Sequence, residues 1–231
     1  MAKPYKILEE IDTDLQERLL EGHRLLEIPA GHQLIFQSDW GADVYVVSKG
    51  VAKARCLTME GDEVVLALIG LGALIGDLAL LSPKPIRTVD VVAITPMSLL
   101  KLRHGAFEDI LKSSPALTQA LSYLQVRRLT SLGNRLMVMH EDATTRLLAT
   151  LLDLARLSSP DADPRQPIPA ISQQEIATIA GLSRGSTSTL ITKLRGNGTL
   201  EQTPEGLRFA NLTALQRRGL LPESTPNQAK T

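Results

Sequence analysis

The apolar residues of this chain follow different spacings in different segments, and these spacings predict where helices and strands lie. Residues 6–26 carry apolar side chains three or four positions apart with charged residues between them, which predicts an amphipathic helix. From residue 31 to residue 103 the pattern changes to short runs of β-branched and aliphatic residues, at 33–36, 44–47, 51–57, 64–69, 88–93 and 98–102. Glycines separate most of these runs. Short strands punctuated by glycine predict an antiparallel β-barrel of the jelly-roll type.

A long helix is expected after the strands. Ser113 and Ser114 can cap a helix that starts at Pro115, and no further proline occurs before Pro160. An apolar seam with one phase shift runs along this segment through Leu117, Leu121, Leu124, Leu129, Leu132, Leu136 and Met139. Such a seam, with few aromatic residues, favours pairing with the same helix of a second subunit. The alternative is a helix that lies flat on the chain's own barrel.

The region after residue 170 has the pattern of a helix-turn-helix. Ser172 and Glu175 form a capping-box pattern at the start of a short helix, and Gly181 permits a tight turn at its end. Ser183 can cap a second helix that runs to about Arg195. A short helix, a turn with glycine and a second helix with apolar residues on one face are typical of this motif.

The second helix of this motif has a side that suits contact with DNA. Its small polar and basic side chains can hydrogen-bond to base edges or phosphates. Arg184 lies near the helix start and can reach guanine, whereas Lys193 is placed for phosphates. The residues expected to contact DNA are Ser172, Gln173, Ser183, Arg184, Gly185, Ser186, Ser188, Thr189, Thr192 and Lys193. Residues 199–202 and 207–209 predict a hairpin that would form a wing, and the alternative is an ordinary helical hairpin.

A second candidate site lies between two of the predicted strands. Residues 74–81 can form a short helix whose first backbone N–H groups point at an anion, and Arg87 can grip phosphate oxygens through its planar guanidinium. Gly76 permits a close approach, and Asp77 can accept from a ribose hydroxyl. The residues expected to bind a small anionic effector are Gly76, Asp77, Leu78, Ala79, Arg87 and Thr88. Alternatively, Arg87 and Asp77 pair across the loop and hold the barrel shut without a ligand.

Composition limits the other classes of function. The 231 residues suffice for two cores with a connector, and the formal net charge of zero means that any surface for nucleic acid is a local patch. The single cysteine, Cys56, excludes a disulfide framework, a cysteine zinc site and a four-thiolate iron–sulfur cluster. It is expected to be a small apolar side chain on a strand. The four histidines are scattered, so neither haem nor another metal is expected.

The same survey speaks against catalysis and against a membrane. No serine, cysteine or histidine cluster has the spacing of a catalytic site, so the chain is not expected to be an enzyme. No stretch approaches the roughly 20 apolar residues needed to span a membrane. The first residues lack an apolar signal segment, and we expect a cytoplasmic protein.

Three motifs resemble those of the CRP/FNR family of bacterial regulators. They are residues 41–47 followed by Gly50, residues 75–80 with Arg87 and Thr88, and residues 181–184 in the helix-turn-helix, in the order and spacing of the family. The resemblance covers nearly the whole chain and implies a homodimer that reads palindromic double-stranded DNA, with RNA polymerase as a further partner. It also implies cyclic AMP or another nucleotide as effector, bound near Leu132 and Gly133 of the neighbouring subunit.

Some positions depart from what the resemblance leads us to expect. Asp77 stands where nucleotide-binding members have glutamate, Val89 where alanine is usual, and residues 132–133 where cyclic-AMP-responsive members have a Thr-Ser pair that contacts the purine. Gly185 and Thr189 replace a glutamate and an arginine of the cyclic AMP receptor, so we expect a different DNA half-site. The alternative function is an effector-independent regulator of the same family, controlled by its own expression level.

These inferences predict an α+β chain with four segments. Residues 1–112 are expected to form an effector-sensing β-barrel domain with an N-terminal helix, and residues 113–140 a central dimerisation helix. Residues 140–142 interrupt the apolar spacing and predict a hinge. Residues 141–221 are expected to form a winged helix-turn-helix domain, and residues 222–231 a disordered tail.

Overall fold

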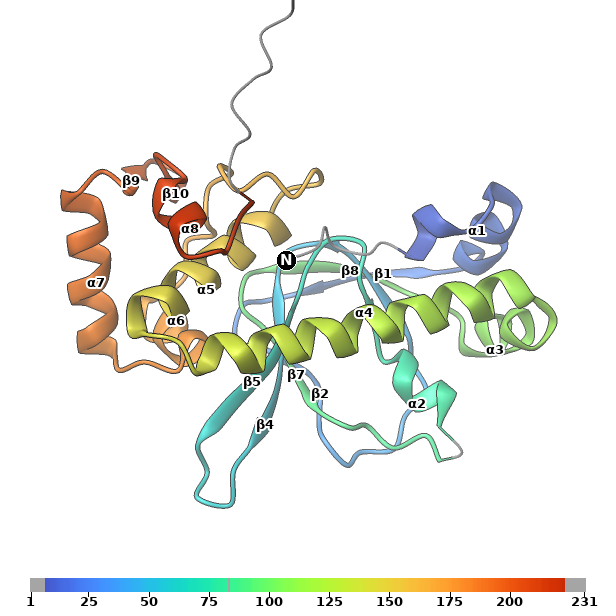
Figure 1. Ribbon diagram of the computed structural model, residues 1–231. Helices are drawn as coiled ribbons and strands as arrows, with labels where there is room; N and C mark the ends of the chain where they lie inside the picture. Colours follow the sequence, from blue (N-terminus) through green and yellow to red (C-terminus); the bar gives the residue numbers. More distant parts are fainter. Residues whose placement is uncertain (1–6, 83, 223–231) are drawn as a thin grey trace, which may run out of the picture.

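A computed structural model describes residues 7–82 and 84–222 of the chain (Figure 1). The tail predicted to be disordered lies outside the described residues apart from Pro222. The chain has an α+β fold in which a jelly-roll-like β domain is joined by one long helix to a helical domain with a two-stranded wing. The fold class expected from the sequence is confirmed.

The β domain consists of two four-stranded antiparallel sheets. One sheet has the strand order β1-β8-β3-β6 and the other has the order β2-β7-β4-β5. The strands are β1 (Arg24–Ile28), β2 (Gln33–Ile35), β3 (Tyr45–Lys49), β4 (Ala52–Leu57), β5 (Glu63–Ile69), β6 (Leu74–Ile75), β7 (Asp90–Ala93) and β8 (Met97–Lys101). Val47, Leu99 and Val91 belong to the apolar cluster that fills the space between the sheets. Burying the side chains of both inner faces is what holds such a sandwich together.

The N-terminal segment differs from the single helix expected over residues 6–26. A 3-10 turn, η1 (Ile7–Glu10), is followed by α1 (Thr13–Leu20) and then directly by strand β1. Asp12 separates the two helical pieces because its carboxylate accepts a hydrogen bond from the backbone N–H of Leu15 at 2.8 Å and caps α1. Strand β1 completes the sheet by pairing with β8.

Two helices follow strand β8, α3 (His104–Ser113) and α4 (Pro115–Met139), of which only the second is predicted from the sequence. Ser114 caps α4 by accepting from the N–H of Leu117 at 3.2 Å, and Pro115 occupies the first turn, as expected. The inward side of the first turns of α4 is not available to a second subunit. Leu117, Leu121 and Leu124 are at most 5% exposed because they pack with η1, α1 and α3 of their own chain. Their assignment to a dimer interface was therefore wrong.

The C-terminal domain contains the predicted helix-turn-helix and wing. It consists of α5 (Ala143–Leu157), α6 (Gln173–Ala180), α7 (Arg184–Gly196), β9 (Leu200–Thr203), β10 (Gly206–Phe209) and α8 (Thr213–Arg217). Strands β9 and β10 pair antiparallel and form the wing. The apolar core of this domain, built around Leu147, Leu151 and Ile179, continues into the β domain through Val51 and Val65. The two domains therefore share one apolar cluster.

Candidate functional site

The turn between α6 and α7 has the geometry that its residues predict. Gly181 ends α6 with a φ of +61°, in the left-handed region that favours glycine. Ser183 caps α7 by accepting from the N–H of Ser186 at 3.1 Å. Ala177 is fully buried in the core between the helices, where a larger side chain would push them apart.

The capping box at the start of α6 is only half formed. Ser172 accepts from the N–H of Glu175 at 3.1 Å, as predicted. The carboxylate of Glu175 instead accepts a hydrogen bond from Lys53 of strand β4. The side chain predicted to cap its own helix therefore joins two domains.

One side of α7 faces solvent and collects most of the residues predicted to contact DNA. Thr187, Ile191 and Leu194 point into the domain and are buried. Ser188 is half-buried. The exposed members are Ser172 and Gln173 at the start of α6, and Ser183, Arg184, Gly185, Ser186, Thr189, Thr192 and Lys193. The structure thus places a continuous polar and basic surface beside the wing, and the role of each residue on it remains a prediction.

The candidate effector site is held closed by a buried arginine. Arg87 is 8% exposed, and its guanidinium donates to the backbone carbonyls of Gly76 and Asp43, both at 2.9 Å. Gly76 has a φ of +92°, and a Cβ at this position would lie 2.3 Å from the Asp43 carbonyl oxygen. Only glycine fits between this carbonyl and the guanidinium. The atoms that approach Gly76 closely are those of Asp43 and Arg87, and the close approach of a ligand stays a prediction.

The ion pair considered as an alternative to a ligand, Arg87 with Asp77, does not form. Asp77 begins the short helix α2 (Asp77–Leu81) and is 1% exposed. Its carboxylate accepts from Arg128 of α4 at 2.7 Å and from Gln125 at 3.0 Å, while Arg128 also donates to the Leu74 carbonyl at 2.8 Å. Sequence reasoning missed Arg128 as a member of the site.

The other residues predicted for this site are distributed around it. Leu78 and Thr88 are exposed, whereas Ala79 is buried. On α4, Leu132 is half-buried and Gly133 is exposed, with no atom within 4 Å of a Cβ built on it. The surface around Gly133 is therefore open to another molecule.

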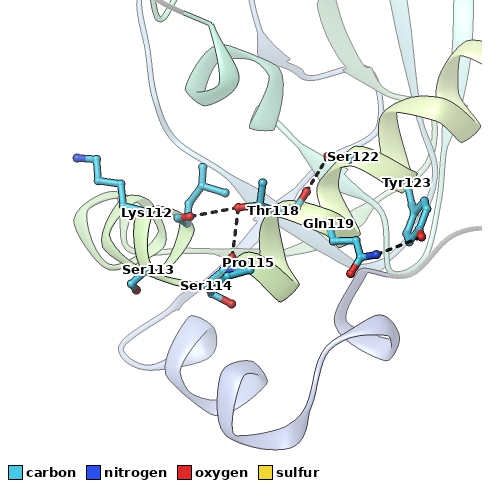
Figure 2. Close-up of a pocket in the computed structure, with 9 residues that line it drawn as sticks. Lys112, Ser113, Ser114, Pro115, Thr118, Gln119, Ser122 and Tyr123 are labelled. Atoms are coloured by element: carbon cyan, nitrogen blue, oxygen red, sulfur yellow. Dashed lines mark hydrogen bonds between the residues drawn. The ribbon is translucent and has the colours of Figure 1, made fainter.

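A hollow at the junction of α3 and α4, of about 510 Å³, was not predicted (Figure 2). Its polar groups are already engaged. Lys112 pairs with Glu108 at 2.8 Å. The Thr118 hydroxyl is within donating distance of the backbone carbonyls of Leu111 in α3 and of Ser114, and the Ser122 hydroxyl donates to the carbonyl of Thr118. Gln119 donates to the Tyr123 hydroxyl at 3.2 Å. The hollow therefore has fewer free polar groups to bind an anionic effector. The better candidate is the segment of residues 74–88 that contains Gly76, Asp77 and Arg87, which we call the cassette.

Helix α4 carries a second apolar face, directed away from its own chain. The side chains of Val126, Leu129, Leu136 and Met137 are 62%, 73%, 58% and 71% exposed, and Gly133 lies among them. Positions 126, 129, 133 and 136 alternate in steps of three and four, which is the spacing of a paired helix. We call these five residues the outward face of α4. Exposed apolar surface of this extent indicates an interaction site.

The link between α4 and α5 is short and anchored. Residues 140–142, the predicted hinge, separate α4, which ends at Met139, from α5, which begins at Ala143, and movement about them stays a prediction. Asp142 caps α5 by accepting from the N–H groups of Thr144 and Thr145 at 2.8 and 3.1 Å, and from Arg218 near α8 at 2.5 Å. Hydrogen bonds from Thr145, together with Arg218, hold the pKa of Asp142 well below its usual range.

Two family models match the chain in the order of these sites. Residues 25–114 match the cyclic nucleotide-binding domain, and residues 145–218 match the Crp-like helix-turn-helix domain. The chain belongs to the CRP/FNR family. It is therefore a transcription regulator with a nucleotide-binding and a DNA-binding domain, and not an enzyme.

Relatives of this CRP/FNR chain span most of its length. The Cyclic AMP receptor protein of Thermus thermophilus is 29% identical over 177 residues, which cover 76% of this chain and 79% of that protein. The cAMP-activated global transcriptional regulator CRP of Escherichia coli is 28% identical over 170 residues, covering 72% of this chain and 80% of that protein.

Solved structures show the same fold at lower identity. FixK2 of Bradyrhizobium japonicum superposes with a TM-score of 0.73 at 17% identity, covering 84% of this chain and 96% of that one. The cyclic-di-GMP-responsive regulator CLP of Xanthomonas campestris gives a TM-score of 0.67 at 22% identity, covering 86% of this chain and 99% of that one.

Among the described residues of the present chain, no helix combines the length and the apolar character that crossing a membrane requires.

Proposed function

We propose that this CRP/FNR-family regulator works as a homodimer that binds a palindromic DNA site under the control of a cyclic nucleotide. The observation that carries the proposal is the division of α4 into two faces. Its inward face holds the β domain through Leu121 and Leu124, whereas its outward face is apolar and exposed. Pairing two outward faces about a twofold axis would bury both, and Gly133 would let the helices approach closely.

Such pairing gives the DNA surface its geometry. Helix α7 lies beyond the end of α4 that carries Leu136 and Met137 (Figure 1). Two parallel α4 helices would therefore present two α7 helices on the same side of the dimer, which matches successive major grooves on one face of DNA. In this proposal Arg184 reads a base and Lys193 holds a phosphate, and RNA polymerase is the expected partner at the promoter.

The effector would act on the cassette around Arg87. The guanidinium can exchange its two carbonyl acceptors for the phosphate oxygens of a cyclic nucleotide, to which it can bind in a bidentate manner. Arg87 binds the carbonyl of Gly76, and the adjacent Asp77 is linked to α4 through Arg128, which also binds the carbonyl of Leu74. A change in the position of Arg87 would therefore be transmitted to the pairing helix. Residues 132–133 of the partner would close the site. Cyclic AMP is the first candidate, because one relative is named as a cyclic AMP receptor and another as cAMP-activated.

A second candidate function is favoured by the same contacts. Arg87 already has two acceptors, and Asp77 already has two donors, so the cassette is satisfied without a ligand. A regulator that binds DNA without an effector, and is controlled by its own abundance, is consistent with this closed arrangement.

Calorimetry and DNA binding together separate the two functions. We would titrate the full chain with cyclic AMP, cyclic GMP and cyclic di-GMP, and measure shifts of genomic DNA fragments with and without each nucleotide. Heat from one nucleotide and a change in DNA affinity, both lost in Arg87→Ala, would support the effector-controlled function. DNA binding that no nucleotide changes would support the effector-independent one. A chain that binds none of the fragments would contradict both.

A further inference from the structure

A buried lysine of the β domain is shared between its own sheet and the DNA-binding domain. Lys53 lies on β4 and is 5% exposed. Its ammonium is 2.6 Å from a carboxylate oxygen of Glu63 on β5 and 2.6 Å from a carboxylate oxygen of Glu175 on α6. Two domains are thus joined by a single buried cation that has a carboxylate on either side.

The β domain balances this cation without help from α6. Arg55 pairs with Glu63 at 2.7 Å and with Asp90 at 3.4 Å, so the two cations and two carboxylates of the sheet cancel in charge. Burial alone would raise the pKa of Glu63, but the hydrogen bonds from Lys53 and Arg55 keep it below its ordinary value. Glu175 is therefore an additional carboxylate, and its attraction to Lys53 depends on how the DNA-binding domain is placed.

The surfaces around this ion pair fit closely. A Cβ added to Gly70 would lie 2.8 Å from the carbonyl oxygen of Leu157 at the end of α5. Arg135 of α4 donates to the Val65 carbonyl of β5 at 2.7 Å, and it also donates to the Ile179 carbonyl of α6. The interface is therefore a packed one, in which the ion pair lies beside apolar contacts and backbone hydrogen bonds.

We propose that the Lys53–Glu175 ion pair is an interdomain latch that holds α6 on the β domain in the orientation in which α7 is ready for DNA. Figure 1 shows α6 between strand β5 and α7, so the domain docks through the face opposite its reading side. Residues 140–142 are the short link about which an undocked domain would swing. Docking restricts the movement of the DNA-binding domain before DNA binds. Such preorganisation raises the affinity for DNA.

The effect on DNA binding follows from the fraction of docked domains. Apparent affinity falls in proportion to the population that is competent to bind. Breaking a buried ion pair on one side leaves the other charge buried and unpaired, which opposes docking. If the docked fraction falls to between about a tenth and a third, the dissociation constant rises by about threefold to tenfold. The latch therefore contributes to DNA affinity although Lys53 touches no DNA in the proposed complex.

The test uses the full chain with Lys53→Met, with Glu175→Gln and with both substitutions together. The matched control is Lys112→Met, because Lys112 also pairs with a glutamate but lies on α3, away from the interface. Affinity is measured on one genomic fragment bound by the wild type, and amide hydrogen exchange is followed in β5 and α6. The inference rests on the proposed DNA binding, but the exchange measurement tests the latch independently of it.

The expected result is that Lys53→Met weakens DNA binding by about threefold to tenfold and speeds exchange in α6 and β5. Lys112→Met should change neither quantity, and the double variant should lose no more than the larger of the two single losses, because both substitutions remove the same ion pair. Unchanged or tighter DNA binding by Lys53→Met would overturn the proposal, as would additive losses in the double variant. A wild-type chain without DNA affinity would contradict the proposed function alone, because the exchange data would still test the latch.

Discussion

Asp77 of the effector cassette and Arg128 of the long helix form an ion pair at 2.7 Å, and the carboxylate is 1% exposed. Arg128 also donates to the Leu74 carbonyl. This one side chain of α4 therefore binds both strand β6, through Leu74, and helix α2, through Asp77. This contact ties the position of α4 to the state of the cassette. In the proposed function, this contact would link the effector site to the surface on which two subunits pair.

Removing either partner of the Asp77–Arg128 ion pair should lower the free energy of unfolding. We expect Arg128→Met to lower the free energy of unfolding by about 2 kcal/mol, because the Asp77 carboxylate stays buried without its cation. The double variant with Asp77→Asn should cost clearly less than the sum of the two single variants. Urea unfolding measures all three. Arg18→Met, which removes an exposed pair with Asp14, should stay within about 0.5 kcal/mol of wild type, and equal losses for Arg18 and Arg128 would refute the interpretation.

The glycine of the cassette should tolerate no side chain. Gly76→Ala would place a methyl group 2.3 Å from the Asp43 carbonyl oxygen in a residue with a φ of +92°. We expect a loss of at least about 3 kcal/mol in unfolding free energy, from the clash and the backbone strain together. Gly105→Ala is the matched variant, because it lies in α3 with no atom within 4 Å of the added methyl. It should stabilise the chain by up to about 1 kcal/mol. Urea unfolding of both variants and the wild type measures these differences.

The features that could be predicted from the sequence are those set by neighbouring residues. All six predicted strand runs correspond to strands. Caps, turns and wing depend on local chemistry, as with Ser114, Gly181 and Ser183. These elements are consistent with their own propensities, which is why periodicity alone finds them.

The features that could not be predicted depend on contacts between distant residues. Nothing local indicates that Asp77 pairs with Arg128, or that Glu175 reaches Lys53 instead of its own N-cap. Helix α4 carries apolar residues on two faces, and the sequence does not say which face meets the chain's own β domain. Strand β1 was hidden because leucines there continue the helical spacing of α1, although sheet pairing with β8 decides its conformation.

The outward face of α4 predicts the response to a charge placed there. Leu129→Glu should prevent pairing, because the two charges would be buried near the twofold axis. We expect a monomer at micromolar concentration in sedimentation equilibrium, and a DNA affinity at least about tenfold weaker because two half-sites are no longer bound together. Leu25→Glu is the control, since Leu25 on β1 is 61% exposed and lies off α4. A Leu129→Glu variant that sediments as the wild type does would exclude this face as the interface.

Asp153 of α5 predicts how stability depends on pH. Burial raises its pKa from an ordinary value of 3.8 to about 6, although Arg135 and Arg156 lower it in part. Between pH 4 and pH 6 the folded chain therefore holds a proton that the unfolded chain has released. As pH rises through this window, folding loses the stabilisation that the bound proton provides.

A full shift of this size would correspond to about 3 kcal/mol, and partial solvent contact of the side chain reduces our expectation to about 1–2 kcal/mol. Asp153→Asn carries no charge to bury, so it should be more stable than wild type above pH 6 and similar to it near pH 4. Chemical unfolding at several pH values measures both chains under identical conditions. Carboxylates such as Glu63, whose pKa is lowered, are common to both proteins, so the difference between the two curves isolates Asp153. Parallel curves from pH 4 to pH 7 would show that folding does not raise the pKa of Asp153.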